Sequence, residues 1–122
     1  MAIASKIITK RVGKVTVVNF IDTAITDTQQ IQHIARELES LIDEKECRFM
    51  VLDFSSVRFL SSQTLGMLLK LHKKLSDKSG WIGLSGLKPE LKKIFKLTRL
   101  DQIFNFYDTP QDAIDAALSY GV

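Results

Sequence analysis

The chain has 122 residues, close to the size of one domain, and its 45% hydrophobic and 25% charged residues are ordinary for a soluble globular protein. These figures exclude collagen-like, low-complexity and intrinsically disordered chains. No apolar run approaches the roughly 18 residues that cross a membrane, and the N-terminus lacks the apolar region of a secretory signal. The single cysteine, Cys47, cannot form an internal disulfide. We therefore expect one cytoplasmic domain, residues 1–122, without membrane insertion.

The charge is unevenly distributed along the chain. Seventeen basic residues against 14 acidic ones give a net charge of +3, which is too small to indicate a nucleic acid partner. Residues 70–99 contain nine basic and two acidic residues, a net charge of +7, so the rest of the chain carries −4. Two interpretations are open: the lysines are the solvated faces of two helices, or they form a surface for an acidic partner or a phosphate.

The first half of the chain alternates between strand and helix patterns. Two segments, Ile3–Thr9 and Val12–Phe20, are predicted strands that turn around Gly13. Asp27–Glu44 is a predicted helix, because apolar residues recur at helical spacing and a capping residue stands at its start. Its expected buried face consists of Ile31, Ile34, Ala35, Leu38, Leu41 and Ile42. Phe49–Phe54 is a nearly continuous apolar run, which is typical of a strand buried on both faces.

The second half continues this alternation. Ser55–Ser61 is a predicted loop, and Ser62–Ser79 is a predicted amphipathic helix ended by Gly80. The remaining predicted elements are a strand at Trp81–Ser85, a helix at Pro89–Leu97, a strand at Ile103–Tyr107 and a helix at Pro110–Tyr120. Strands that alternate with helices predict an α/β fold with a mainly parallel or mixed sheet under helical cover.

Residues suited to catalysis or metal binding are few. His33 and His72 lie in predicted helices without a second ligand at metal-binding spacing, so we expect no metal and no cofactor. Asp53 ends an apolar strand, where a carboxylate serves as a base or, more often, bonds the backbone amides of a neighbouring loop. Cys47 follows two glutamates whose charges oppose thiolate formation, so we expect it to be unreactive.

The most informative segment runs from Val51 to Gly66. It combines a buried strand, a loop and a serine pair, Ser61 and Ser62, that opens a helix. One of these serines is a predicted N-cap, which accepts a hydrogen bond from a free amide of the first turn. The same position suits a phosphate, because free N–H groups and the positive helix end stabilise a dianion.

This segment resembles the STAS domain, the sulfate transporter and anti-sigma factor antagonist family, and especially its free-standing bacterial members. Asp53 matches the polar end of the family's strand, and Phe59–Gly66 (FLSSQTLG) matches its motif of aromatic, apolar, Asp, Ser, Ser or Thr, Gly, Leu and Gly. The N-terminal strand pair and residues 86–89 also occupy family positions. The resemblance implies an α/β fold: a STAS-like mixed sheet with a strand pair at the N-terminus and four or so helices mainly on one face.

By this resemblance the chain is an anti-sigma factor antagonist and not an enzyme. The implied partner is an anti-sigma factor with serine kinase activity that phosphorylates Ser62, and a phosphatase resets the switch. The implied partner-binding residues are Asp22, Ser61, Ser62, Gln63 and Thr64. Three of them depart from the family motif: Ser61 replaces the aspartate, Gln63 replaces a Ser or Thr, and Thr64 replaces a glycine. Loss of the aspartate removes a charge beside the target hydroxyl, which bears on recognition by the kinase.

Two other interpretations stay open. One is a non-phosphorylated structural STAS subunit of a transport or signalling assembly. The other is an enzyme or nucleotide-binding module that uses Asp53 and Ser62, against which the missing phosphate-binding loop counts.

Overall fold

The two N-terminal strands form a hairpin at one edge of the main sheet. In the computed structural model, which describes residues 5–120, β1 (Ile7–Val12) pairs antiparallel with β2 (Val15–Phe20). Gly13 makes the turn with φ of +59°, a conformation that glycine adopts at little cost. The first strand therefore ends three residues later than the predicted Ile3–Thr9, because the polar residues before the turn continue the ladder. Residues 3 and 4 lie outside the described residues.

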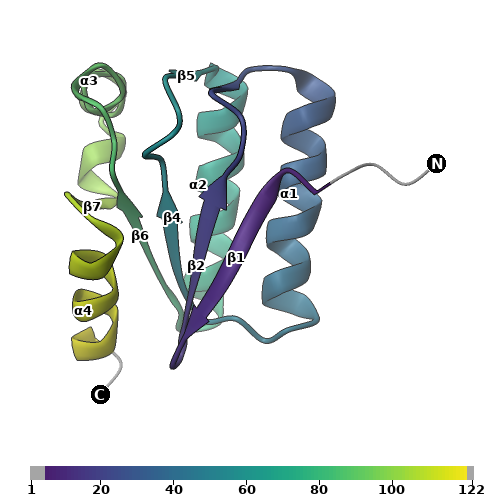
Figure 1. Ribbon diagram of the computed structural model, residues 1–122, viewed down its shortest axis with the longest axis vertical. Helices are drawn as coiled ribbons and strands as arrows, with labels where there is room; N and C mark the ends of the chain where they lie inside the picture. The colour runs from purple at the N-terminus through teal and green to yellow at the C-terminus, as the bar shows by residue number, and fades with distance from the viewer. Residues whose placement is uncertain (1–4, 121–122) are drawn as a thin grey trace.

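Three parallel strands complete the main sheet. They are β4 (Phe49–Asp53), β6 (Trp81–Ser85) and β7 (Asn105–Tyr107), and the strand order is β1-β2-β4-β6-β7. Because β2 is parallel to β4, the sheet is mixed, as the sequence predicts. The carboxyl ends of β2 and β4 point to the side of the molecule where β5 lies (Figure 1).

The last strand is shorter than predicted. The sequence suggests Ile103–Tyr107, but Ile103 and Phe104 both donate their backbone N–H to the Leu100 carbonyl at 3.0 Å. They close the 3₁₀ turn η1 (Leu100–Gln102) and cannot join the ladder.

Within residues 5–120, four helices cover the sheet, three of them on one face. Val18 and Phe20 of β2 point to the face covered by α1 (Thr28–Asp43), α2 (Ser62–Asp77) and α3 (Pro89–Leu97). The alternate side chains of the same strand belong to a smaller apolar cluster under α4 (Pro110–Tyr120). Figure 1 shows α1 and α2 side by side and α4 apart from them. The predicted arrangement of helices mainly on one face is confirmed.

The helix ends follow local chemistry. Asp27 caps α1, and its side chain accepts a bond from the backbone N–H of Gln30, as the sequence predicts for an N-cap. At the end of α2, however, Ser79 rather than Gly80 adopts the left-handed conformation, with φ of +58°. Gly80 is required for a different reason, since a Cβ there would lie 2.6 Å from the carbonyl oxygen of Arg48.

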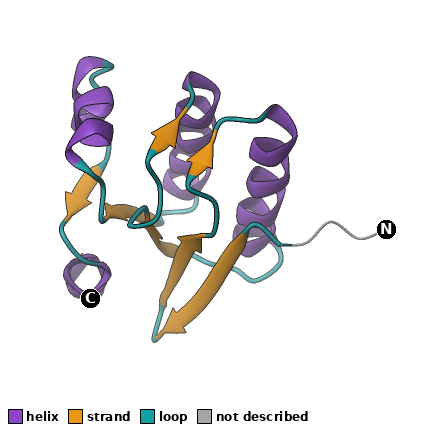
Figure 2. Cartoon of the chain, turned by 45° about the horizontal axis from the view of Figure 1, so that its top comes forward, coloured by secondary structure: helices purple, strands orange, loops and turns teal. Residues whose placement is uncertain are grey.

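Two very short strands pair outside the main sheet. β3 (Ala24–Ile25) follows β2, β5 (Phe59–Leu60) follows β4, and the two are parallel neighbours. Figure 2 shows them side by side, close to the starts of two helices. The sequence predicts only a loop at Ser55–Ser61, and this prediction is wrong in part, because strands of two residues have no alternation to detect.

Candidate functional site

The serine pair at the start of α2 divides into one capping and one exposed residue. Ser61 has extended backbone, with φ of −98°, and its hydroxyl accepts the backbone N–H of Thr64 at 3.3 Å. Ser62 is the first residue of the helix and is exposed. Its hydroxyl therefore reaches solvent in the first turn, where free backbone N–H groups and the helix dipole favour negative charge.

Thr64 is buried rather than presented to solvent. Only 1% of this residue is exposed, and its Oγ1 donates to the backbone carbonyl of Ile25 at 2.7 Å. The same Oγ1 lies 3.2 Å from the hydroxyl of Ser61. Thr64 therefore fastens the start of α2 to β3 and positions the serine pair.

The short strands join the two loops that carry the predicted site residues. The backbone N–H groups of Arg58 and Phe59 both donate to the carbonyl of Thr23, at 2.7 and 3.3 Å. Ser61 donates its backbone N–H to the carbonyl of Ile25 at 3.3 Å. The loop after β2 and the loop after β4 thus form one clasp, which we define as residues 21–25 and 58–61.

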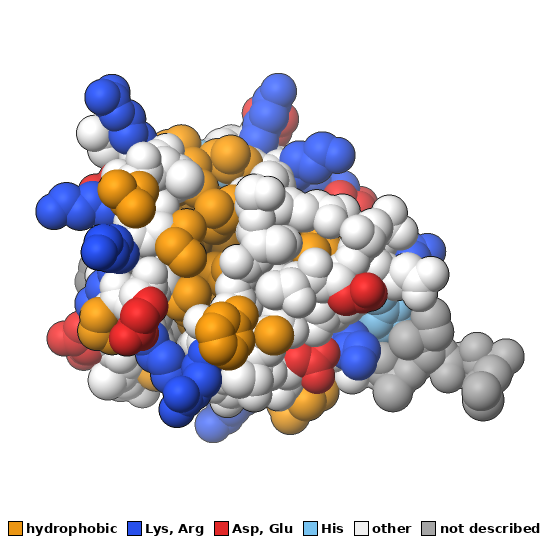
Figure 3. All heavy atoms as spheres, turned by 90° about the horizontal axis from the view of Figure 1, so that it is seen from above, with side chains coloured by type: hydrophobic (Ala, Val, Ile, Leu, Met, Phe, Trp, Pro, Cys, Tyr) orange, Lys and Arg blue, Asp and Glu red, His pale blue; other side chains and the backbone are white. Residues whose placement is uncertain are grey.

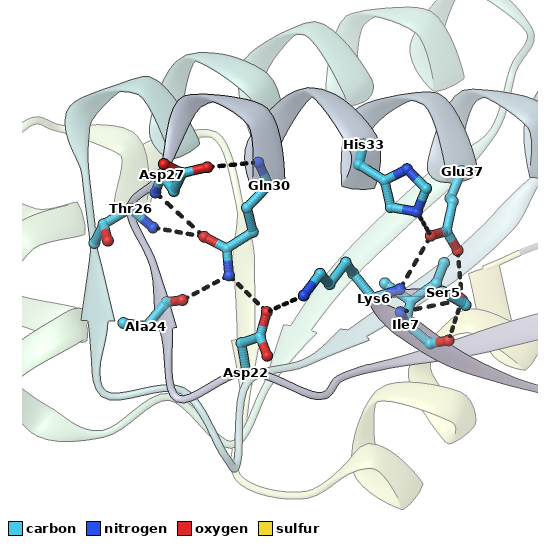
Figure 4. A network of polar contacts seen from close by, with 10 residues as sticks. All are labelled: Ser5, Lys6, Ile7, Asp22, Ala24, Thr26, Asp27, Gln30, His33 and Glu37. Atoms are coloured by element: carbon cyan, nitrogen blue, oxygen red, sulfur yellow. Dashed lines mark hydrogen bonds and ion pairs between the residues drawn. The ribbon is translucent and has the colours of Figure 1, made fainter. Parts of the chain in front are cut away.

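Asp22 belongs to this clasp and is held by a side-chain network. Its Oδ2 accepts from Nε2 of Gln30 at 2.7 Å and lies 3.5 Å from Nζ of Lys6 (Figure 4). Gln30 also accepts, at Oε1, the backbone N–H groups of Thr26 and Asp27. The carboxylate of Asp22 is thereby oriented by α1, while a third of the side chain stays exposed.

Gln63 connects the start of α2 to the start of α1. Its Oε1 accepts from the hydroxyl of Thr28 at 3.1 Å. Both residues are exposed, so the bridge lies on the surface beside Ser62. The structure therefore brings Asp22, Ser61, Ser62 and Gln63 onto neighbouring segments at one end of the sheet. Local sequence patterns did not predict the role of Thr28, because it depends on a contact across 35 residues.

Asp53 supports the clasp from below. Its carboxylate accepts from Asn19 Nδ2 at 2.6 Å, from the Ser55 hydroxyl at 2.6 Å and from the Ser85 hydroxyl at 3.2 Å. The backbone N–H of Ser55 adds a fourth bond at 3.3 Å. The predicted bond from a loop amide is confirmed, and three side chains share the carboxylate with it. Asp53 is buried, and these bonds stabilise its charge.

Apolar side chains are exposed on the clasp. Phe59 is 61% exposed and Ile21 is 49% exposed, which is unusual for large apolar residues on neighbouring segments. Viewed from the side where the parallel strands end (Figure 3), apolar side chains gather near the middle of the surface, with lysines and arginines around them. An apolar centre with a charged rim is the usual composition of a protein interface. Periodicity did not predict these exposed residues.

The two histidines and the cysteine that were considered for metal binding or catalysis lie outside the clasp residues. His72 is half-buried, with its ring edge-on to Phe104 at 5.4 Å, and so packs at the boundary of the core. His33 lies 2.7 Å from a carboxylate oxygen of Glu37 on the same helix. Burial raises the pKa of the Cys47 thiol, so its thiolate is suppressed by desolvation rather than by the neighbouring glutamates.

Residues 5–120 contain neither a cluster of metal ligands nor a helix able to span a membrane. Within residues 5–120, no three His, Cys, Asp or Glu side chains group closely enough to hold a metal ion. None of the helices in that range combines the length and apolar character needed to cross a membrane.

A sequence model of the STAS domain matches residues 6–113. The match covers most of the chain, and the order of strands and helices described above agrees with it. The protein belongs to the STAS domain family.

Three similar proteins illustrate this membership. A Thermotoga maritima protein, named as a candidate anti-sigma factor antagonist, is 31% identical over 55% of this chain and 58% of its own length. The structure of an anti-sigma factor antagonist from Mycobacterium paratuberculosis is 26% identical over 91% of this chain and 92% of that chain, with a TM-score of 0.79. The phosphorylated Bacillus cell fate determinant SpoIIAA shares the fold, with 18% identity over 90% and 97% of the two chains and a TM-score of 0.71.

Proposed function

We propose that this protein is a cytoplasmic anti-sigma factor antagonist that acts by binding and not by catalysis. The observation that carries the proposal is the exposed Ser62 hydroxyl at a helix start, beside the clasp with its exposed Phe59 and Ile21. The names of the Thermotoga and Mycobacterium relatives support the choice of partner. The partner contacts Asp22, Gln63 and the serine pair, while Thr64 supports them from within.

Phosphorylation of Ser62 is the proposed switch. The partner anti-sigma factor also acts as the serine kinase, and a phosphatase removes the phosphate. A phosphoserine carries about −1.5 to −2 charge, and the free N–H groups of the first helical turn accommodate it without unfolding the helix. The bond that caps α2 comes from Ser61, so modification of Ser62 leaves it in place. The added charge must be desolvated in the interface, which releases the partner.

Ser61 fits this switch in spite of its departure from the motif. Serine and aspartate are comparable N-caps, so Ser61 keeps the structural task of the motif aspartate and drops its charge. The carboxylate of Asp22, held by Gln30, is then the acidic group that the clasp presents to the kinase.

The test compares three forms of the protein for affinity toward the anti-sigma factor encoded nearest to it. Ser62→Ala should bind like the parent, because the surface stays neutral and compact. Ser62→Asp should bind about tenfold more weakly or worse, since one buried charge costs about 1–3 kcal/mol. Ser119→Asp is the matched control, because it adds the same charge on the exposed face of α4.

Two further readouts accompany the binding data. Mass analysis of the protein from its native cell should find a single phosphate that maps to Ser62. Thermal melts should show all forms folded, since a domain of this size has about 5–15 kcal/mol of stability. Equal affinity of the parent and both Ser62 variants would remove Ser62 from the mechanism and favour a permanently assembled structural STAS subunit.

A further inference from the structure

The outer edge of β1 carries unpaired backbone groups. The two-residue turn pairs Val12 with Val15, and Ile21 donates its backbone N–H to the Lys6 carbonyl. The backbone N–H and C=O groups of every second residue from Lys6 to Val12 therefore point toward β2. The backbone groups of Ile7, Thr9 and Arg11 therefore face outward. The Ser5 side chain covers Ile7, bonding its carbonyl at 2.8 Å and its N–H at 3.4 Å.

The outward groups of Thr9 and Arg11 have no hydrogen-bond partner among residues 5–120. The strand is six residues long and forms an end of the sheet, since β2 is its only ladder neighbour in that range. Such an edge is a template for another extended segment. Ile8, on the opposite face of the strand from Ile7, is 60% exposed, so an added strand would also cover apolar surface.

A groove runs between this edge and α1. Its volume is about 480 Å³, and Ile7 and Thr9 line it from the strand side. Arg36, Ser40 and Leu41 line it from the helix side. A free strand edge that faces a helix across a partly apolar groove is the geometry in which proteins bind extended peptides by strand addition.

The groove is lined by one acidic residue whose carboxylate is engaged by neighbouring groups and by one basic residue whose guanidinium is largely unpaired within the described residues. The carboxylate of Glu37 is fully engaged, because it accepts from the Ser5 hydroxyl at 2.7 Å and the Lys6 N–H at 3.1 Å, and lies 2.7 Å from His33 (Figure 4). The guanidinium of Arg36, in contrast, makes only one long bond within the described residues, 3.4 Å from Nε to the Gln32 carbonyl. A ligand carboxylate would find its partner there.

We propose that the groove between β1 and α1 binds an extended segment of another protein, which adds a strand to β1 and places an acidic side chain against Arg36. The main-chain bonds run to Thr9 and Arg11, and alternate apolar side chains of the segment enter the groove. A second copy of this chain is the weaker occupant. Two β1 strands side by side would bring Lys10 and Arg11 of both copies together, and like charges on neighbouring strands are destabilising.

The test titrates the isotope-labelled protein with a defined peptide pool and follows backbone amides by NMR. The pool is Ac-Φ-Ser-Φ-Thr-Glu-Ser-Φ-NH₂, in which each Φ is Val, Ile, Leu or Phe, so that the glutamate and the apolar side chains lie on the same face of the strand. The amides of Thr9 and Arg11 should shift and become protected from hydrogen exchange, because both point into the new ladder. A pool with N-methylated backbone should produce neither effect, since it cannot form the ladder.

Two variants distinguish strand addition from nonspecific binding of the peptides. Thr9→Pro removes an outward N–H and leaves the β1–β2 ladder intact, so it should fold and lose the shift at Arg11. Arg36→Glu, an exposed change, should weaken binding of the pool about tenfold or more and favour a pool with Lys in place of Glu.

Three results would overturn the proposal. One is an absence of shifts at Thr9 and Arg11 with the parent pool. Another is equal binding of the N-methylated pool. The third is a concentration-dependent dimer, seen by analytical ultracentrifugation and abolished by Thr9→Pro, which would assign the edge to a second copy. None of these outcomes depends on Ser62 or its partner.

Discussion

Neighbouring serines at the start of α2 carry different tasks. The Ser61 hydroxyl accepts the backbone N–H of Thr64, whereas the Ser62 hydroxyl makes no hydrogen bond within the described residues and Ser62 is exposed. The residue that caps the helix and the residue proposed to be phosphorylated are therefore adjacent but distinct. The sequence left open which serine caps the helix, because both stand before the same apolar stripe, and only the extended backbone of Ser61 decides it.

This separation predicts unequal costs for alanine at the two positions. Ser61→Ala should lower the free energy of unfolding by about 1 kcal/mol, since it leaves a first-turn N–H without its acceptor. Ser61→Asp should restore that value, because aspartate is an equally good cap. Ser62→Ala is the control and should change stability by less than about 0.5 kcal/mol. Urea unfolding of the four proteins measures these differences, and a larger loss at Ser62 would reverse the assignment.

The buried thiol of Cys47 should make the free energy of unfolding depend on pH. Burial raises the pKa of its thiol above the ordinary value of 9.0, so the unfolded chain loses the thiol proton at lower pH than the folded one. The protonated Cys47 thiol therefore contributes to the free energy of unfolding fully below its pKa in the unfolded chain. This contribution is lost as pH rises through its pKa in the folded protein. Compared with Cys47→Ala, the parent protein should therefore lose stability more steeply above pH 9.0. Chemical unfolding at a series of pH values tests this, and parallel curves would contradict it.

At the scale of elements, the loops after β4 and β6 depend on each other. Gly86 has φ of +69°, and a Cβ there would overlap the Ser55 hydroxyl and lie 2.8 Å from the carboxylate of Asp53. The bonds of Asp53 to Ser55 in the loop after β4 and to Ser85 at the end of β6 thus require a residue without a side chain at this point. This cluster keeps the base of the clasp in one geometry.

Gly86→Ala should therefore destabilise the protein by about 1–3 kcal/mol, from backbone strain and displacement of the Asp53 cluster. Gly66→Ala is the matched control. Gly66 lies in α2 with open space around it, so alanine should raise stability by about 0.5–1 kcal/mol. Thermal melts of the two variants should move in opposite directions. A destabilising Gly66→Ala or a neutral Gly86→Ala would contradict this account.

The secondary-structure elements with the longest repeating sequence patterns were predicted most accurately. The helix α1 repeats its apolar spacing over four turns, and the sequence predicted it within one residue at each end. The serine pair and Asp22 were found through family resemblance, which supplies long-range proximity that periodicity lacks. The pairing of β3 with β5 and the burial of Thr64 depend on contacts across more than 30 residues, and local patterns do not contain them.

At the scale of the whole molecule, one sheet supports two apolar clusters of unequal size. The larger cluster lies under α1, α2 and α3, and the smaller lies between the sheet and α4. Alternate residues of β4 belong to different clusters: Met50 and Leu52 to the larger, Val51 to the smaller. Both clusters pack on the same strands, so loss of one cluster exposes the strands that support the other. The two clusters should therefore unfold together.

Trp81 makes this cooperativity measurable. It is the only tryptophan in the chain and lies in the smaller cluster, with its ring 6.0 Å from that of Tyr107. Its fluorescence reports the α4 side of the sheet, whereas far-ultraviolet circular dichroism reports all the helices. Urea unfolding followed by both signals should give coincident transitions.

Ile114→Ala in α4 extends the test, because it weakens only the smaller cluster directly. The side chain is buried in that cluster, so its truncation should cost about 2–5 kcal/mol. If the clusters unfold together, fluorescence and circular dichroism should shift by the same amount. Leu118→Ala on the exposed side of α4 is the control and should shift neither signal measurably. A fluorescence transition that moves to lower urea while circular dichroism stays in place would show that α4 detaches first and that the sheet does not couple its two faces.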